Sequence, residues 1–373
     1  MSKASAATSQ WRLIFVTLKT AMDYQQIVSL LGDEAESLLG HRCLKIPTAS
    51  LSAPSANQML DVFRQSSRSA MVMTNLNKLY RQGRLGGTGY LSIFPVDQGL
   101  EHTAAYSFYQ NPQFFDPDNI VKLAVEAGCS GVATSMGVLD LVAQKYAEQI
   151  PLIAKLNHSE HLTYPPITDQ LMFGSVERAY NSGAVGIGAT VYFGSSRSPR
   201  QIEQVTAAIE QAHRLGMFAI IWCYPRNPLY LRAEQDYTTA VDITAQAIHI
   251  AVTMGADLVK QKMPTKLHGF IDLKFSQANP EMYERLLTDH PIDLVRYQVA
   301  HAYMGKIGLI NSGGESQGET DLRQAVKAAV INKRAGGQGL IMGRKVFKRS
   351  WDEGITLLQA VQDVYLTKEI TLA

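Results

Sequence analysis

The run Ala256-Asp257-Leu258-Val259-Lys260-Gln261-Lys262 decides the fold, because an apolar strand follows directly on a helical pattern. The helical pattern consists of apolar residues three or four apart and ends at a glycine: Val241, Ala245, Ile248, Val252 and then Gly255. A helix, a glycine and a strand in that order are typical of a βα unit in a parallel sheet.

The same order recurs along the chain. Asp116-Pro117 supplies an N-cap residue followed by proline at the first helical position, and Gly128 ends that helix. Ser198-Pro199 with Gln201 predicts a capping box for another helix. Between such helices the apolar runs predict eight strands, at residues 89–96, 131–135, 152–156, 184–192, 218–224, 258–262, 308–312 and 339–343.

Eight βα units predict an α/β protein with a closed (β/α)8 TIM barrel, in which function lies at the C-terminal ends of the strands. An open doubly wound sheet would require a glycine motif after the first strand, whereas Gly86-Gly87-Thr88-Gly89 precedes that strand. We expect residues 1–21 to be a disordered tail with Met22 as a candidate natural start, 22–85 a helical extension and 86–373 the barrel. The long segment between Lys262 and Gly308 is expected to serve as a lid or a subunit contact.

The composition excludes several classes of protein. The 35 basic and 33 acidic residues are interspersed and give a net charge of +2, so we expect no nucleic-acid partner. No apolar run reaches the about 18 residues that span a bilayer, so we expect no membrane partner. The three cysteines, Cys43, Cys129 and Cys223, lack metal-finger or redox spacing, which favours a reducing compartment and the cytoplasm.

Lys260 is the strongest chemical signal, because it places an amine at the end of a buried strand. A free lysine titrates near ~10.4, so an amine that is half neutral at about pH 7.4 needs a bias of roughly 4 kcal/mol against its charge. Burial, or a neighbouring cation such as Lys155 or Lys262, provides that bias, and a neutral amine can form a Schiff base with a ketone. The structural alternative is a lysine that reaches solvent or pairs with Asp97.

Polar and aromatic side chains accumulate where the other predicted strands end. In chain order these ends supply Asp97, Lys155, Tyr192, Trp222 and Tyr224. Trp222 and Tyr224 stand two residues apart and therefore lie on one face of a strand. The sequence predicts that they share a pocket with Lys260. The polar neighbours that we expect to be rim residues with satisfied hydrogen bonds are Glu101, His102, Asn157 and His158.

Strands seven and eight end in glycine-rich turns. Asn311-Ser312-Gly313-Gly314 presents consecutive backbone N–H groups, and Gly343-Arg344 begins a helix. TIM barrels commonly bind phosphate at these two strands, and arginine can donate two hydrogen bonds to it. The glycines also suit simple tight turns. A nucleotide-binding loop is excluded, because the lysine and hydroxyl residue of that motif are missing.

Several ordered motifs together point to a known family. They are Pro95-Val96-Asp97-Gln98-Gly99, Lys155-Leu156-Asn157, Gly194 after Tyr192, Trp222-Cys223-Tyr224, the run from Gly255 to Lys262, Asn311-Ser312-Gly313-Gly314 and Gly343-Arg344. Through them the chain from about Met22 to Ala373 resembles the bacterial branch of the archaeal-type class I fructose-1,6-bisphosphate aldolases. It departs from shorter archaeal members at Gln98, where they have histidine.

The resemblance implies a lyase that reversibly cleaves fructose 1,6-bisphosphate into dihydroxyacetone phosphate and glyceraldehyde 3-phosphate, in glycolysis and gluconeogenesis. It implies that Lys260 forms the Schiff base, that Tyr224 moves protons and that Asp97 assists beside them. The expected substrate-binding residues are Trp222, Lys155, Tyr192, Ser312, Gly313, Gly314, Gly343 and Arg344. We expect no cofactor and no metal, because the covalent bond replaces a metal, and we expect a homo-oligomer, with a decamer implied by the family.

Three alternatives stay open. The first is a related lysine-barrel enzyme on another sugar phosphate, either a thiolase acting on a phosphorylated dione or an aldol-type synthase; the Trp222 and Tyr224 pair favours sugar cleavage instead. The second is a metal-dependent aldolase with His158 and His161 as ligands, which lack a carboxylate or helix to orient them. The third is a non-enzymatic phosphate-binding barrel or a scaffold subunit, neither of which would need a converging lysine, tyrosine and aspartate.

Overall fold

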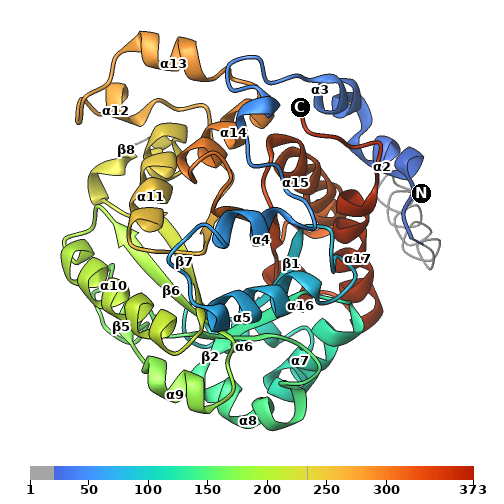
Figure 1. Cartoon of the computed structure of the whole chain (residues 1–373), viewed down its shortest axis with the longest axis vertical. Coiled ribbons are helices and arrows are strands. Elements are labelled where there is room, and N and C mark those ends of the chain that lie inside the picture. Colours follow the sequence, from blue (N-terminus) through green and yellow to red (C-terminus); the bar gives the residue numbers. More distant parts are fainter. Residues whose placement is uncertain (1–20, 233) are drawn as a thin grey trace, which may run out of the picture.

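The computed structural model describes residues 21–232 and 234–373 of the chain (Figure 1). The expected tail at residues 1–21 therefore falls, except for its last residue, outside the described residues. Eight parallel strands close into a barrel in the order β1-β12-β11-β10-β7-β6-β3-β2, which confirms the predicted (β/α)8 architecture. In the described part of the chain, every helix is too short or too polar to traverse a bilayer.

The eight barrel strands agree with the predicted ones to within two residues at each end. They are β1 (Leu91–Val96), β2 (Gly131–Ser135), β3 (Leu152–Lys155), β6 (Gly186–Phe193), β7 (Phe218–Pro225), β10 (Leu258–Gln261), β11 (Gly308–Ser312) and β12 (Gly339–Ile341). Their residues are almost continuously buried, as expected for a parallel sheet covered on both faces. Two short hairpins lie outside the barrel: β4 (Asn157–His158) with β5 (Leu171–Met172), and β8 (Leu231–Arg232) with β9 (Gln235–Asp236).

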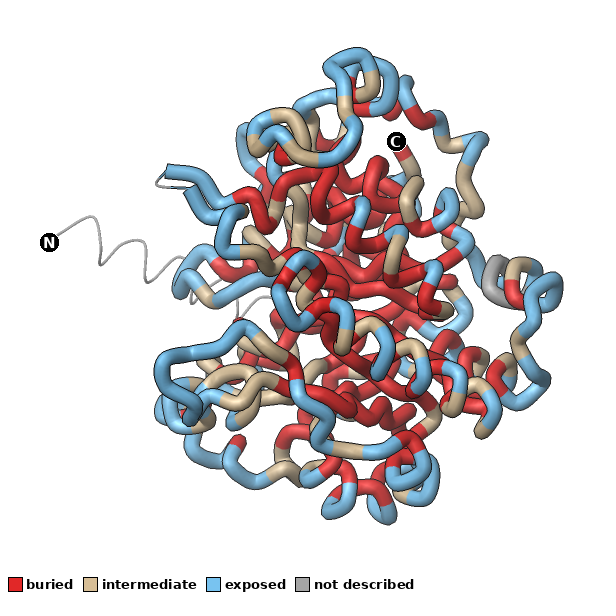
Figure 2. Tube along the Cα trace, turned by 90° about the vertical axis from the view of Figure 1, so that its left-hand side faces the viewer, coloured by how far each residue is buried: buried red, intermediate tan, exposed pale blue. Residues whose placement is uncertain are grey.

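One main helix follows each barrel strand and forms the outer layer. These helices are α7 (Pro117–Glu126), α8 (Met136–Tyr146), α9 (Val176–Asn181), α10 (Ser198–Arg214), α11 (Val241–Thr253), α14 (Pro291–His301), α15 (Asp321–Ala335) and α17 (Trp351–Leu366). Shorter helices are α6 (Ala104–Phe108), α12 (Gly269–Asp272), α13 (Pro280–Leu286) and α16 (Arg344–Phe347). Figure 2 shows the buried residues concentrated in the centre of the molecule and the exposed ones in peripheral turns.

The predicted capping box at the start of α10 is wrong. Ser198 is the first residue of the helix and makes no capping hydrogen bond from the N-cap position. The Gln201 side chain is instead occupied by tertiary contacts, because its Oε1 accepts from the Tyr192 backbone N–H at 2.8 Å and its Nε2 donates to Asp169 at 2.8 Å. Gln201 therefore fixes the end of β6.

The N-terminal extension contains α2 (Tyr24–Leu31), α3 (Ala35–Gly40), α4 (Gln58–Phe63) and α5 (Ala70–Arg81). Helices α2 and α3 pack on α15. Helix α5 crosses the N-terminal end of the barrel (Figure 1), where Asn75 donates to the Gly216 carbonyl at 2.8 Å in front of β7. Tyr80 on the same helix donates to Gln338 in front of β12. The extension thus closes the end of the barrel opposite the C-terminal strand ends.

The segment between β10 and β11 contains α12, α13 and α14. Helix α14 packs against both α11 and α15 and is therefore the regular outer helix of this βα unit. Only α12 and α13 are additional to the barrel. The inserted part of this segment is thus shorter than its length in the sequence suggests.

Candidate active site

A cavity of about 600 Å³ opens at the C-terminal end of the barrel. All eleven residues predicted from the sequence line it: Asp97, Lys155, Tyr192, Trp222, Tyr224, Lys260, Ser312, Gly313, Gly314, Gly343 and Arg344. Met263 is the last lining residue before Ser312, so residues 264–307 contribute nothing to its wall. The expectation of a lid in that segment is therefore not supported by the cavity.

Lys260 on β10 points into this cavity. The residue is 8% exposed, so it is largely shielded from solvent. Its Nζ lies 5.5 Å from the centre of the Trp222 ring and 5.4 Å from that of Tyr224. Burial lowers the pKa of Lys260 to about 7, with Lys155 and Arg344 contributing and Asp97 opposing. A large fraction of this amine is consequently neutral near neutral pH.

Lys155 on β3 is a second buried amine, but its pKa is raised where that of Lys260 is lowered. Its Nζ lies 2.6 Å from Glu101 Oε1 and 3.4 Å from Asp97 Oδ2. Burial disfavours its charge, but the two carboxylates outweigh burial and raise the pKa of Lys155. Burial would likewise raise the pKa of Glu101, but the charge and the hydrogen bond of Lys155 hold it well below its usual value. Lys155 is thus a fixed cation beside Lys260.

Both ring nitrogens of His158 contact Lys155, the cation of this ion pair. Its Nε2 lies 3.1 Å from the Lys155 backbone oxygen, and since a carbonyl only accepts, Nε2 carries the proton. Its Nδ1 lies 3.4 Å from Lys155 Nζ and accepts. Burial lowers the pKa of His158, which keeps the ring neutral. His158 therefore offers no free nitrogen to a metal, which removes one of the two ligands that the metal-dependent alternative requires.

The expectation that four polar residues are rim residues is wrong for most of them. Glu101 and His102 line the cavity, and Glu101 makes the central ion pair. Asn157 is 1% exposed and holds the backbone of Thr190 through two hydrogen bonds of 2.7 Å. One signal could have identified Glu101: it stands four residues after Asp97, and the Glu101 N–H donates to the Asp97 carbonyl at 3.0 Å, so both belong to one turn.

Aromatic residues of β6 and β7 form one wall. Burial raises the pKa of Tyr224 far above its usual value, so the phenol stays protonated. Gly188 on β6 leaves room for Trp222, because a Cβ at this glycine would lie 2.6 Å from the indole ring. Within the described residues, Trp222 Nε1 and Gln98 Oε1 are buried without a hydrogen-bond partner. One is a donor and the other an acceptor, a combination that suits the hydroxyl groups of a ligand.

The glycine-rich ends of β11 and β12 meet at the opposite wall. The prediction of consecutive free N–H groups is wrong at Gly313, whose N–H donates to the Ile341 carbonyl at 3.0 Å because the ladder between the strands continues one residue further. Gly314 adopts a φ of +77°, and apart from Gly314 and its two chain neighbours no described atom lies within 4 Å of the place where a side chain would begin, so this side of the turn is open to a ligand. Arg344 makes an ion pair with the exposed carboxylate of Glu315.

Two further cations, Arg226 and Lys262, line the cavity and were not among the residues predicted to bind substrate. The Arg226 guanidinium carbon lies 5.5 Å from the Tyr192 ring centre and 5.7 Å from that of Tyr224. Burial, followed by the charge of Arg226, lowers the pKa of Lys262. Arg226 could have been found by its position, since it follows Tyr224 by two residues, directly after the end of β7. Because Asp97 and Glu101 are paired with Lys155, the remaining cations give the cavity a positive surplus that suits an anionic ligand.

Fold and site together define a (β/α)8-barrel protein with a buried, partly neutral amine at the catalytic end of the barrel, the arrangement used for covalent chemistry on carbonyl compounds. The family model described as DeoC/LacD family aldolase matches residues 91–349. The chain belongs to this aldolase family.

Similar proteins agree with this assignment. The chain is 52% identical over 347 residues to "Probable fructose-bisphosphate aldolase class 1" of Chlamydia muridarum, covering 93% of this chain and 99% of that protein. It is 28% identical over 283 residues to "Fructose-bisphosphate aldolase/6-deoxy-5-ketofructose 1-phosphate synthase" of Methanocaldococcus jannaschii, covering 74% and 81%. A solved archaeal fructose-1,6-bisphosphate aldolase, with its catalytic lysine covalently bound to the carbinolamine intermediate, has a TM-score of 0.59 at 27% identity and covers 78% of this chain and 99% of that one. The resemblance to archaeal-type class I aldolases is confirmed.

Proposed function

We propose that the protein is a class I fructose-1,6-bisphosphate aldolase of glycolysis and gluconeogenesis, which acts in the cytoplasm and forms its Schiff base at Lys260. The observation that supports this most is the buried Lys260 amine, whose pKa burial lowers to about 7, in a cavity with a surplus of cations. The reaction needs neither metal nor other cofactor, because a protonated imine withdraws the electrons of the bond being broken.

The proposed chemistry begins when the neutral Lys260 amine attacks the C2 ketone carbon and forms a carbinolamine. Loss of water gives an iminium. A base removes the C4 hydroxyl proton, the C3–C4 bond breaks, and its electron pair forms an enamine with the iminium while glyceraldehyde 3-phosphate leaves. Protonation of C3 and hydrolysis of the imine then release dihydroxyacetone phosphate and regenerate the amine.

The neighbours of Lys260 fit the individual proton transfers. Tyr224, whose ring centre lies 5.4 Å from Nζ, is proposed to carry the proton between the C4 oxygen and C3. Asp97, held by Lys155 at 3.4 Å, is proposed to assist the carbinolamine and its loss of water. The unpartnered Trp222 N–H is proposed to donate to a substrate oxygen. Each role requires hydrogen-bond reach in the substrate complex.

Two groups of residues suit the two phosphates of the substrate. The phosphate next to the ketone is assigned to Ser312, Gly313, Gly314, Gly343 and Arg344. To bind there it must displace Glu315, whose side chain is 76% exposed and can move into water. The distal phosphate is assigned to Arg226 and Lys262. A related lysine-barrel enzyme on another sugar phosphate would share the first group, and the second group favours a substrate phosphorylated at both ends.

The test is to incubate the protein with dihydroxyacetone phosphate, reduce it with borohydride and map the modified peptide by mass spectrometry. We expect one adduct per chain, on Lys260. Lys260→Met should abolish the adduct and turnover, whereas the matched control Lys262→Met should keep the adduct, because this ligand has no second phosphate. An adduct on Lys262, or none at all, would refute the proposed function.

A further inference from the structure

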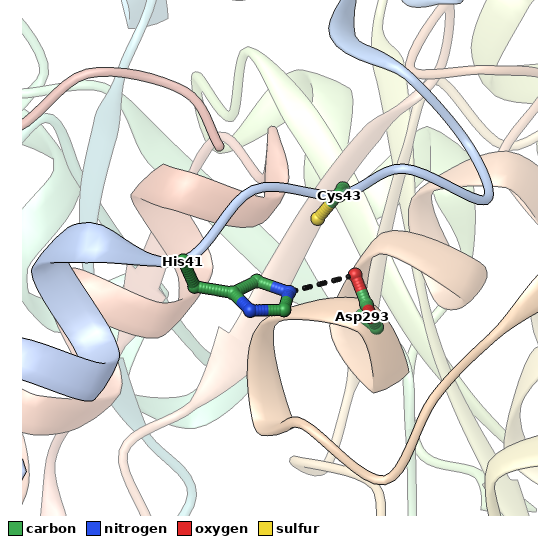
Figure 3. Close-up of side chains that lie close together, drawn as sticks. All are labelled: His41, Cys43 and Asp293. Atoms are coloured by element: carbon green, nitrogen blue, oxygen red, sulfur yellow. Dashed lines mark hydrogen bonds and ion pairs between the residues drawn. The ribbon is translucent and has the colours of Figure 1, made fainter.

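We propose that His41, Cys43 and Asp293 form a binding site for a zinc-class divalent cation, remote from the catalytic cavity (Figure 3). His41 and Cys43 follow α3 of the N-terminal extension, and Asp293 belongs to the first turn of α14. None of the three lines the catalytic cavity. The ion would therefore fasten the extension to the outer layer of the barrel and take no part in the aldolase chemistry.

The distances are close to those of a metal site. His41 Nε2 lies 3.1 Å from Asp293 Oδ1, and the three ligand atoms all lie within 4.8 Å of one another. Zinc bonds to nitrogen, oxygen and sulfur place neighbouring ligands of a tetrahedron about 3.3 to 3.6 Å apart. The His41 and Asp293 atoms already come close to this separation, so mainly the Cys43 sulfur has to approach. Three protein ligands leave the fourth position to water.

Two neighbours hold the ligands in place. Thr288 donates its hydroxyl hydrogen to Asp293 Oδ2, which leaves Oδ1 directed at His41. The His290 ring stacks on His41, with centroids 3.6 Å apart and planes 7° apart. The two His290 nitrogens face Ser37 Oγ at 3.2 Å and the Ile292 N–H at 3.3 Å, so this ring supports His41 and is not itself a ligand. Oriented ligands of this kind raise metal affinity.

Binding of the ion releases one proton to solvent and involves no oxidation or reduction. Burial, with the Asp293 carboxylate, raises the pKa of Cys43 to about 12, so without an ion the thiol keeps its proton. On binding, the S–H bond breaks, a sulfur–metal bond forms and that proton passes to solvent, while the His41 ring proton moves from Nε2, which now faces Asp293, to Nδ1 and frees Nε2 for the ion. The thiolate and carboxylate together then balance the two charges of the cation.

Two buried arginines beside the cluster narrow the choice of ion. Arg296 donates to the carbonyls of Ile46 and Ala335, both at 2.6 Å, and Arg334 donates to the carbonyls of Leu38 at 2.7 Å and His41 at 2.8 Å. These donors leave the three ligand atoms free. Their charge favours the thiolate and opposes weakly held cations, so the site selects a thiolate- and imidazole-binding ion over Mg²⁺ or Ca²⁺, which prefer oxygen ligands.

The test uses the full chain, stripped with a chelator and titrated with Co²⁺ as a spectroscopic substitute for zinc. We expect one Co²⁺ per chain, with a thiolate-to-cobalt charge-transfer band that disappears when Zn²⁺ displaces it, and a zinc-dependent rise in the thermal midpoint. Cys43→Ser should lose the band and the thermal shift. The matched control Cys129→Ser, at a buried cysteine far from the cluster in sequence, should keep both.

Borohydride trapping of dihydroxyacetone phosphate in Cys43→Ser should equal that of the unaltered protein, which shows that the variant is folded. A second variant, His41→Ala, keeps the thiol and should weaken Co²⁺ binding at least about tenfold, as expected for loss of one ligand. A band that persists in Cys43→Ser would overturn the proposal. So would a stripped protein that takes up no Co²⁺, in which case the three side chains form only a hydrogen-bonded contact.

Discussion

The protonation state of Lys260 depends on the charges that surround it. Lys155 lowers the pKa of Lys260, because two positive charges in one buried cavity repel each other, whereas Asp97 raises it. Lys155 can act in this way because Glu101 and Asp97 keep it charged. The carboxylates thus influence the reactive amine through the second lysine as well as directly.

Lys155→Met should shift the pH dependence of Schiff-base formation to higher pH. Only the neutral amine attacks a ketone, so the rate of borohydride-trapped adduct formation in the unaltered protein should rise as pH passes through about 7. Loss of the Lys155 charge raises the pKa of Lys260 and moves that rise upward. The exposed Lys122→Met serves as the control. An unchanged or lower midpoint in Lys155→Met would contradict this coupling.

Tyr224→Phe should separate covalent binding from turnover. The variant keeps the amine and the ring, so dihydroxyacetone phosphate should still be trapped, while kcat for cleavage should fall by about 10²- to 10⁴-fold, as for the loss of a general acid–base group. Tyr192, paired with Tyr224 across the two strands, provides the matched control. Tyr192→Phe should change mainly KM. Equal losses of kcat in both variants would argue against a special role for Tyr224.

Arg344→Ala and Glu315→Gln should have opposite effects on phosphate affinity. The first removes a charge-assisted contact, which costs about 1 to 3 kcal/mol and raises KM accordingly. The second frees Arg344 from its present ion pair and should tighten the binding of inorganic phosphate as a competitive inhibitor. Steady-state kinetics with and without phosphate measure both. If the two substitutions weaken phosphate binding alike, the ion pair does not compete with the ligand.

At the scale of single elements, predictions succeed where the determinants are local. Asp116 caps α7 as expected, because it needs only the N–H of Asp118, which donates to it at 3.0 Å. The expectation for Gln201 fails because its side chain is taken by the end of β6, a contact made by the folded chain. The prediction of a free N–H at Gly313 is wrong for a similar reason, since the partner of this N–H lies on another strand.

The attachment of the N-terminal extension to the barrel gives a prediction at the same scale. Arg68 lies 2.5 Å from the fully buried Asp257 in front of β10 and also donates to the Gly255 carbonyl at 2.8 Å. Arg68→Ala leaves a buried carboxylate short of one partner and should lower the free energy of unfolding by about 3 kcal/mol. The exposed Arg64→Ala should change it by less than about 0.5 kcal/mol. Denaturant unfolding followed by circular dichroism measures both, and similar values would contradict the prediction.

At the scale of the whole molecule, the sequence was sufficient to predict the barrel and the residues around Lys260. The strands are recognisable from local composition, and the closure of eight parallel strands brings their ends together wherever the loops run. The function of Glu101 was missed because it depends on a loop after β1 meeting Lys155 on β3. The closure of the barrel by α5 was missed because helical periodicity does not say which surface a helix covers.

The resemblance to known aldolases also predicts that the protein is a homo-oligomer, with ten chains. Leu162 (93% exposed) and Tyr164 (91% exposed) are large side chains on the surface of the single chain, and a subunit contact at this loop would bury them. Light scattering coupled to size-exclusion chromatography gives the mass in solution. A mass near 41.1 kDa, that of one chain, would contradict the prediction.

The position of α5 determines the end of the barrel through which ligands enter and leave the cavity. Because α5 covers the N-terminal end of the barrel, the described chain leaves the chamber open at the end where Arg226 and Lys262 stand. In the proposed reaction the ketone fragment is still bound covalently to Lys260 after the bond is cleaved, so we expect the aldehyde fragment to leave first. In the direction of synthesis the same covalent intermediate must form first, so we expect the aldehyde to be the second reactant to enter.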